Sequence, residues 1–186
     1  SFVNDSMVQI KYMSKTLSDF RNFLKPSTKK VLFSISKALN EINEIIGKQV
    51  FYSNINMNFK YKNKNEELLI YGYENEFKQV LLNIINNAKN KIVEKNLPLN
   101  KKGEININIQ RCENCNMIEI IDDAGAIDEK IINSIFEPYF TTKENGMGLG
   151  LYMAKIIIED KMKGTISVRN DKNCVIFTIK LPFKKA

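Results

Sequence analysis

Two acids and a short turn close an apolar run near the middle of the 186-residue chain. Asp122 and Asp123 lead into the turn Ala124-Gly125-Ala126. Carboxylates at the end of a strand can accept hydrogen bonds from a polar ligand. A turn beside a ligand usually carries glycine, because glycine lets the backbone approach closely. Ala124 and Ala126 therefore differ from the glycines usually found in such a turn. Other parts of the chain must indicate which ligand this turn holds.

A row of side-chain amides lies along the helix expected over residues 76–95. At about 100° per residue, one arc is apolar and the neighbouring arc carries amides. The apolar residues are Phe77, Val80, Leu81, Ile84, Ile85, Ala88 and Ile92, and the amides are Gln79, Asn83, Asn86, Asn87 and Asn90. Asparagine is a poor helix former, because its side chain competes for backbone hydrogen bonds. Asn83 and Asn87 lie one turn apart and can offer oxygen to a hard cation and nitrogen to an anion, which suits Mg²⁺ bridging phosphates. A polar surface arc in an Asn-rich protein is the alternative interpretation.

Three glycines at alternate positions, Gly146, Gly148 and Gly150, run directly into another predicted helix. Glycines let backbone N–H groups approach phosphate, and the N-terminus of a helix favours negative charge. The pattern alone is weak evidence, since no Walker-type Lys-Ser/Thr follows it. Just upstream, "IFEPYFTTK" places aromatic residues, a proline and Lys143 beside the glycines. This cluster predicts either the anchor of a mobile lid or ordinary core packing.

The elements that must position these residues alternate between helix and strand. Apolar residues spaced by three and four predict a helix over residues 2–25, which Pro26 ends. This helix either joins a helical bundle or packs on the same domain. After the linker-like "KPSTKK", Ser36 is expected to cap a helix that Gly47 closes. Further helices are expected over 76–95 and 150–162, strands over 51–61, 68–72, 104–110, 116–122, 164–170 and 174–183, and a loop over 122–147. This order predicts an α+β fold with helices on one face of a sheet.

Composition excludes several classes of function. The formal charge of +7 invites a nucleic-acid interpretation, but the lysines are scattered along the chain with no run longer than a pair, which is typical of a solvated surface. No apolar run approaches the roughly 18 residues of a membrane span, and the first residues lack the pattern of a signal peptide. Cys112 and Cys115 have C-x-x-C spacing, but with Cys174 they supply three cysteines, and no histidine is present to complete a zinc site. Two cysteines in a hairpin loop is the favoured interpretation.

In order, these motifs resemble the ATP-binding catalytic domain of sensor histidine kinases, in the GHKL ATPase superfamily with the Bergerat fold. The N box is matched by "QVLLNIINNA", the G1 box by "DDAGAI", the F box by "FEPYF" and the G2 box by "GMGLGL". The resemblance covers residues from about 33 to 183 and implies a two-layer α/β sandwich with a mixed, mainly antiparallel sheet. The segment "MSKTLSDFRNFLKP" resembles the end of the second helix of the dimerisation and phosphoacceptor hairpin. We therefore expect that tail at residues 1–30 and the catalytic domain at 31–186.

The resemblance also implies a role for each matching residue. Asn83 would coordinate Mg²⁺ and Asn87 would contact the phosphates of ATP or ADP, while Asp122 would accept the exocyclic amine of adenine. Gly146, Gly148 and Gly150 would shape a lid, Lys143 would reach a phosphate oxygen, and the expected nucleotide contacts also include Gly125, Ala126 and Leu151.

The family pattern at the G1 turn is usually Asp-x-Gly-x-Gly, so both alanines depart from it. If residue 126 requires a positive φ, or the base lies against it, a methyl group costs about 1–2 kcal/mol. That cost would weaken ATP binding roughly five- to thirty-fold.

The function that the resemblance implies is histidine kinase activity in a bacterial two-component system. This domain would present ATP and Mg²⁺ to a histidine that the chain lacks. Implied partners are the phosphoacceptor helical domain of the same protein, a response regulator and a second copy in a homodimer. The implied location is the cytoplasm, either as a free protein or as the cytoplasmic part of an inner-membrane sensor. No nucleic-acid partner is expected. One alternative is a degenerate scaffold that binds nucleotide weakly or not at all. Another is a GHKL clamp ATPase, which would place glutamate where Asn83 stands, because hydrolysis needs a base.

Overall fold

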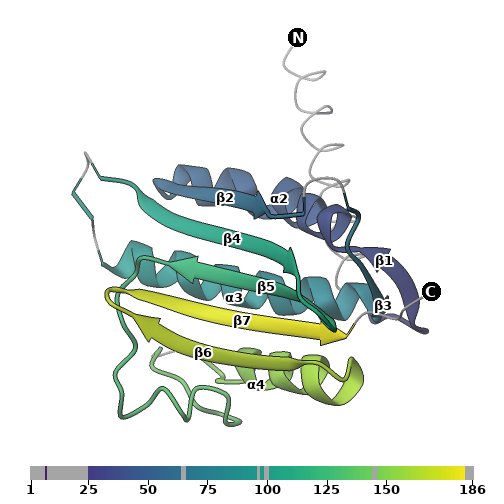
Figure 1. Ribbon diagram of the computed structural model, residues 1–186. Helices are drawn as coiled ribbons and strands as arrows, with labels where there is room; N and C mark the ends of the chain where they lie inside the picture. The colour runs from purple at the N-terminus through teal and green to yellow at the C-terminus, as the bar shows by residue number, and fades with distance from the viewer. Residues whose placement is uncertain are drawn as a thin grey trace.

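The computed structural model describes residue 7 and residues 25–63, 66–95, 97–98, 101–143 and 146–182. In this part of the chain, helices cover one face of a five-stranded sheet (Figure 1). The strand order is β2-β4-β5-β7-β6, and all neighbours are antiparallel except β2, which runs parallel to β4. The strands are β2 (Ile55–Tyr61), β4 (Gly103–Arg111), β5 (Cys115–Asp122), β6 (Thr165–Asp171) and β7 (Cys174–Pro182). The predicted α+β fold is confirmed, whereas the helix expected over residues 2–25 lies, apart from residues 7 and 25, outside the described residues.

Alternation of side chains along the strands explains the asparagine-rich sequence of the sheet. In β4, Ile105, Ile107 and Ile109 are fully buried against the helices, and the residues between them face the open side of the sheet. On that side, Asn56 and Asn58 of β2 donate hydrogen bonds to the Glu104 carboxylate at 2.9 and 3.0 Å. The period of two therefore separates an isoleucine core from a hydrogen-bonded polar face.

Helix α3 (Glu74–Glu94) lies at the centre of the helical layer, packed against both α2 (Ile35–Tyr52) and α4 (Gly150–Lys155), as Figure 1 shows. All seven apolar residues predicted for its buried arc are buried. The chain continues from α4 into η1 (Ile156–Lys161), a wider turn of π-helix. Among the described residues, no helix is both long enough and apolar enough to cross a membrane.

The predicted boundaries of the first described helix, α2, are wrong at both ends. Ser34, not Ser36, is the N-cap, and its Oγ accepts a hydrogen bond from the Lys37 N–H at 3.4 Å. The helix continues past Gly47 to Tyr52, because Val50 extends its buried face beyond the glycine. A four-residue strand, β1 (Val31–Ser34), was not predicted; it pairs antiparallel with β3 (Leu69–Gly72) as a separate two-stranded sheet.

Residues 25–27 are hydrogen-bonded to the first turn of α3. The Ser27 N–H donates to the carboxylate of Glu76 at 3.2 Å, and the Asn75 N–H donates to Ser27 Oγ at 3.2 Å. Asn75 Nδ2 also donates to the carbonyl of Lys25 at 2.8 Å. Because Glu76 is only 6% exposed, this attachment is partly shielded from water and fixes the chain where it enters the domain.

Candidate nucleotide-binding site

Asp122 is a buried carboxylate at the end of β5. It is 4% exposed, and it occupies one of the alternate positions of β5 that face the helices. Burial raises the pKa of Asp122 to about 6, and Asp123 also raises it, whereas the hydrogen bond from the Ala124 N–H and the charge of Lys95 lower it. The Ala124 N–H donates to Oδ1 at 3.1 Å, and in the described part of the chain no hydrogen bond reaches Oδ2. Asp122 therefore presents a poorly solvated acceptor to a ligand N–H group.

The turn after Asp122 is fastened on both sides by residues that the sequence did not indicate. Lys95, just after α3, donates from Nζ to the carbonyl of Asp123 at 3.0 Å. Asn170 of β6 accepts from the Ile127 N–H at 2.9 Å and donates to the Ile127 carbonyl at 2.8 Å, so its amide imitates a strand partner. Asp123 itself accepts from the Glu104 N–H at 3.0 Å. No local sequence signal could have indicated these contacts, because each joins segments distant in the chain.

A positive φ at Ala126, one of the two conditions under which its methyl group would weaken nucleotide binding, is not found. The residue of this turn with a positive φ is Gly125, at 103°, and Ala126 is an exposed residue without one. A Cβ built on Gly125 would meet no atom within 4 Å. Backbone strain is thus removed as a reason for weakened nucleotide binding, and glycine stands at the position of the turn that requires it.

Because Ala126 is unstrained, we expect Ala126→Gly to change ATP affinity by less than about twofold. The variant should instead lose about 0.4–1 kcal/mol of unfolding free energy, because glycine increases the conformational entropy of the unfolded chain. Calorimetric titration and urea denaturation measure the two effects. A fivefold or larger gain in affinity would mean that the methyl group lies against the ligand.

Asn83 and Asn87 each use one atom of the side-chain amide within the protein. Asn83 Nδ2 donates to the carbonyl of Gly150 at 3.3 Å, and Asn87 Oδ1 accepts from Lys143 Nζ at 3.0 Å. These two contacts leave Asn83 with an oxygen and Asn87 with N–H donors for a ligand. The oxygen suits a hard cation, and the N–H donors suit an anion such as phosphate.

The donor set around Asn83 fits Mg²⁺ held jointly with a phosphate. In the described ranges, no group of three or more acidic, cysteine or histidine side chains is arranged to hold a metal ion by itself. Mg²⁺ is commonly bound through one or two protein oxygens together with substrate phosphates and water. Asn83 Oδ1 can supply the protein oxygen of such a site.

The glycine segment lies against the backbone of the F-box segment. Gly148 has φ of 65°, and a Cβ built on it would lie 2.6 Å from the Phe140 carbonyl oxygen and 2.7 Å from the Phe140 nitrogen. The F-box segment is anchored by Phe136, whose ring packs edge-on against Phe177 with centroids 6.3 Å apart. Tyr139, by contrast, is 76% exposed. Packing against the core is confirmed for Phe136 and Phe140, whereas the role of the cluster as the anchor of a lid stays a prediction.

Helix α3 brings most of the predicted site together. Asn83 contacts Gly150, Asn87 contacts Lys143, and Lys95, immediately after the helix, contacts the turn that follows Asp122. Since an α-helix rises 1.5 Å per residue, these attachment points are spaced by about 6 and 12 Å. Asp122 has no direct hydrogen bond to either asparagine among the described residues and is linked to α3 through its neighbour Asp123.

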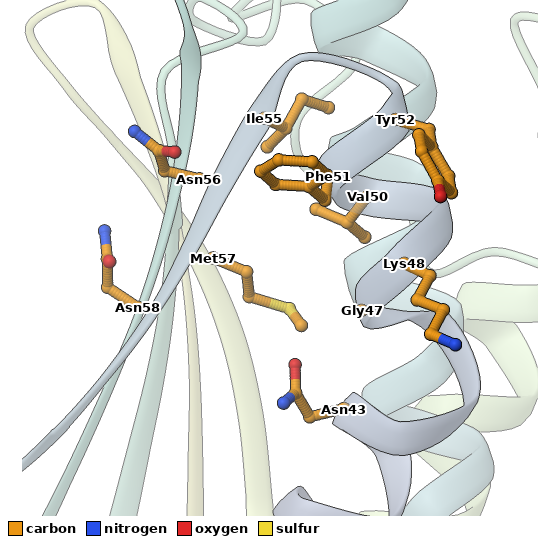
Figure 2. Close-up of a pocket in the computed structure, with 10 residues that line it drawn as sticks. All are labelled: Asn43, Gly47, Lys48, Val50, Phe51, Tyr52, Ile55, Asn56, Met57 and Asn58. Carbon is orange, nitrogen blue, oxygen red and sulfur yellow. The ribbon is translucent and has the colours of Figure 1, made fainter.

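A pocket of about 450 Å³ lies elsewhere, between the C-terminal half of α2 and strand β2 (Figure 2). In Figure 2, Met57 and Asn43 project into the space between the helix and the strand, whereas Asn56 and Asn58 lie on the other side of β2. None of the predicted nucleotide contacts lines this pocket. It borders the β2 edge of the sheet, whereas the predicted lid leads into α4 on the other side of α3.

The fold and the residues around α3 define the ATPase catalytic domain found in histidine kinases. Residues 72–185 match the family described as "Histidine kinase-, DNA gyrase B-, and HSP90-like ATPase", and the chain belongs to it. This match confirms the predicted superfamily and includes all the predicted nucleotide contacts.

Individual relatives agree with this assignment. Sporulation kinase A of Bacillus subtilis (strain 168) is 30% identical over 171 residues, which are 90% of this chain and 27% of that protein. The nucleotide-free catalytic domain of the histidine kinase ThkA matches with a TM-score of 0.70 and 28% identity, over 83% of this chain and 96% of that chain. ThkA in complex with the response regulator TrrA matches with a TM-score of 0.69 and 22% identity, over 98% of this chain and 51% of that chain. The chain spans only 27% to 40% of the length of four sporulation kinases that it matches.

Proposed function

We propose that this chain is the nucleotide-binding part of a two-component sensor histidine kinase and presents ATP with Mg²⁺ to a histidine outside these 186 residues. The observation that carries the proposal is the arrangement along α3. An amide oxygen at Asn83 and amide N–H donors at Asn87 lie one helical turn apart. Asn83 is held by Gly150 of the predicted lid, and Asn87 is held by Lys143, upstream of the lid. This is the pairing of donor and acceptor that a metal-bound phosphate chain requires.

Each side chain has a distinct proposed role in holding the nucleotide. Asp122 accepts the exocyclic amine of adenine at Oδ2, while Oδ1 stays bonded to the Ala124 N–H. Asn87 and Lys143 donate to phosphate oxygens, and Asn83 offers its oxygen to Mg²⁺. When bound, Mg²⁺ would neutralise part of the charge of the triphosphate. Gly125, Ala126 and Leu151 complete the proposed contacts, and the segment from Gly146 through Gly148 to Gly150 closes over the phosphates.

The chemistry proposed for the whole protein is transfer of the γ-phosphoryl group. A histidine nitrogen attacks the γ-phosphorus, the bond to the β-phosphate oxygen breaks, and ADP leaves. This chain contains no histidine, so its own contribution is to position the nucleotide and stabilise its charge.

The same proposal includes the partners and domain boundary of the whole protein. The catalytic domain begins near residue 31, where β1 starts, and residues 1–30 belong to the dimerisation and phosphoacceptor hairpin. That hairpin supplies the histidine and pairs with a second copy, and a response regulator receives the phosphoryl group. The regulator in the ThkA complex supports this last assignment. Since ATP is the substrate, the domain works on the cytoplasmic side.

Titration of the purified chain with ATP in the presence of Mg²⁺ tests the proposal. We expect saturable binding at sub-millimolar concentration and no incorporation of labelled phosphate into the chain, because the acceptor is absent. GTP, which presents a carbonyl where ATP presents an amine, should bind at least about tenfold more weakly. Absence of heat with ATP at millimolar concentration would instead identify the chain as a scaffold.

Mg²⁺ is expected to increase the ATP affinity of the wild type. In Asn83→Ala this increase should be about tenfold smaller, because the variant lacks the proposed metal ligand. Binding of ATP in the presence of a chelator should change by less than about threefold. Asn90→Ala is the matched control, since Asn90 is an exposed amide on the same helix. The assignment of the metal to Asn83 is refuted if both variants respond to Mg²⁺ as the wild type does.

A further inference from the structure

The turn between β4 and β5 places two cysteines directly opposite each other. Arg111 pairs with Asn116 at the end of the antiparallel ladder, and Cys112 and Cys115 are the next pair toward the turn. The Cys112 N–H donates to the Cys115 carbonyl at 2.7 Å, so this pair is hydrogen-bonded across the hairpin. Hydrogen-bonded partners in antiparallel strands have Cα atoms about 5.5 Å apart. That separation lies within the range of about 4.4–6.8 Å that disulfides span.

Both cysteines also project from the same side of the sheet. Side chains alternate along each strand, and the buried isoleucines of β4 occupy positions 105, 107 and 109. Cys112 and Cys115 consequently lie on the open face, in line with Gln110 and Met117, which pair with each other. Both thiols are free and partly exposed. An oxidant in solution can therefore reach them without opening the core.

The sulfur atoms are close enough to interact in the reduced protein. Burial raises the pKa of the Cys115 thiol, and a hydrogen bond with the Cys112 side chain raises it further, against the lowering effect of Lys180. A raised pKa decreases the fraction of thiolate at neutral pH and so slows the attack of Cys115 on a disulfide. Oxidation of this pair is therefore expected to be slow, so it is followed at equilibrium.

We propose that Cys112 and Cys115 form a redox modification site, which low-molecular-weight disulfides such as glutathione disulfide convert to a cross-strand disulfide. One cysteine thiolate attacks a sulfur of glutathione disulfide and expels one glutathione thiolate, leaving a mixed disulfide on the protein. The second cysteine then attacks the protein sulfur of that mixed disulfide and expels the second glutathione. Two protein thiols are oxidised, and one glutathione disulfide is reduced to two glutathione molecules.

This site lies at the end of β5 opposite to Asp122. The two ends of β5 are separated by seven residues, or about 23 Å at 3.3 Å per residue. The base of the hairpin is joined instead to β3 and the segment before it. Arg111 forms an ion pair with Glu66, and Asn116 Nδ2 donates a hydrogen bond to the Leu69 carbonyl at the start of β3. Oxidation should accordingly leave nucleotide affinity unchanged, so this proposal and the proposed function can fail separately.

The test equilibrates the 186-residue chain with a series of glutathione redox buffers, then traps free thiols by alkylation and measures the intact mass. We expect the wild type to lose two alkylatable thiols together, so that its mass after alkylation is lower by two alkyl groups, with no glutathione attached to the pair and the new bond mapped to Cys112 and Cys115. Cys174 lies at the start of β7, at the other end of the sheet, and serves as the internal reference. It should at most acquire a single glutathione.

Single variants distinguish a bonded pair from two independent thiols. In Cys115→Ser, the glutathione adduct at Cys112 should persist, because the resolving thiol is gone, and Cys112→Ser should behave likewise. Cys174→Ser is the matched control and should retain the oxidation behaviour of the wild-type pair. The proposal is overturned if Cys112 and Cys115 each hold a separate glutathione in the wild type, or if both stay alkylatable across the whole series.

Discussion

Asp122→Asn is expected to weaken ATP binding by about 100-fold while making the free protein more stable. The asparagine keeps an oxygen for the Ala124 N–H, but it replaces Oδ2 with an N–H donor. The adenine amine then loses a charged acceptor and meets another donor. A hydrogen bond to a charged group contributes about 1.5–3 kcal/mol, and 1.4 kcal/mol is tenfold in affinity. Calorimetric titration with ATP and Mg²⁺ measures this loss.

The gain in stability follows from the raised pKa of Asp122. Its value of about 6 in the folded protein exceeds the ordinary value of 3.8, so the folded state binds the proton more tightly than the unfolded state does. The contribution of Asp122 to the unfolding free energy therefore falls by roughly 3 kcal/mol as pH rises from about 4 through about 6, and stays level above that. Asparagine does not ionise, so the variant is spared this loss.

Urea denaturation at pH 4.5 and pH 7 checks the prediction, and the stability advantage of Asp122→Asn should be about 2 kcal/mol larger at pH 7. Asp123→Asn is the matched control, because the new side chain can still accept from the Glu104 N–H. We expect that control to change ATP affinity by less than about threefold. If Asp122→Asn binds ATP like the wild type, Asp122 is not the adenine acceptor. If the variant is less stable at pH 7, burial does not penalise the carboxylate.

Gly148→Ala is expected to weaken ATP binding at least about tenfold, whereas Gly150→Ala should change it by less than about twofold. Gly148 has φ of 65°, where a side chain costs about 1–2 kcal/mol. Its Cβ would also lie 2.6 Å from the carbonyl oxygen of Phe140, a backbone atom that cannot rotate away as a flexible side chain can. The glycine segment must therefore shift away from the residues on α3 that it contacts.

Gly150 supplies the control, since it lies in α4 and a Cβ there would be 3.6 Å from the side-chain amide of Asn83, an ordinary contact. Alanine is up to about 1 kcal/mol better than glycine within a helix, so this variant should be as stable as the wild type or more so. Titration with ATP and thermal unfolding of both variants provide the comparison. Equal losses of affinity in the two variants would show that the conformation of Gly148 is not what matters.

Sequence reasoning succeeded where a long periodic pattern decides the structure. The seven apolar residues predicted for α3 are all buried, and the alternation in β4 and β5 fixed both the hairpin and its buried face. Strand β1 escaped prediction because its four residues form no pattern of their own and are ordered by pairing with β3, which lies more than 30 residues away. The cap at Ser34 was missed for a similar reason, since it marks the junction of that unpredicted strand with α2.

At the candidate site, too, the sequence indicated the types of residue involved but not the contacts between distant segments. The sequence indicated the asparagines of α3, but not which amide atom each would leave for a ligand, because Gly150 and Lys143 decide this. The sequence left open whether residue 126 needs a positive φ, since the conformation of the turn after Asp122 depends on how distant residues hold it. Lys95, at the end of α3, and Asn170, in β6, form hydrogen bonds with the turn. The residue of the turn with a positive φ is Gly125.

The attachment of residues 25–27 to the first turn of α3 has a mechanical consequence. The helix is 21 residues long, or about 31 Å, and the turn beyond Asp122 is bonded just past its far end. A rotation imposed on the chain at Ser27 is thus passed to α3. The same helix carries Asn83 and Asn87, which contact Gly150 and Lys143. A movement of residues 25–27 would therefore carry α3 with it, together with the side chains on this helix that the proposed nucleotide site uses.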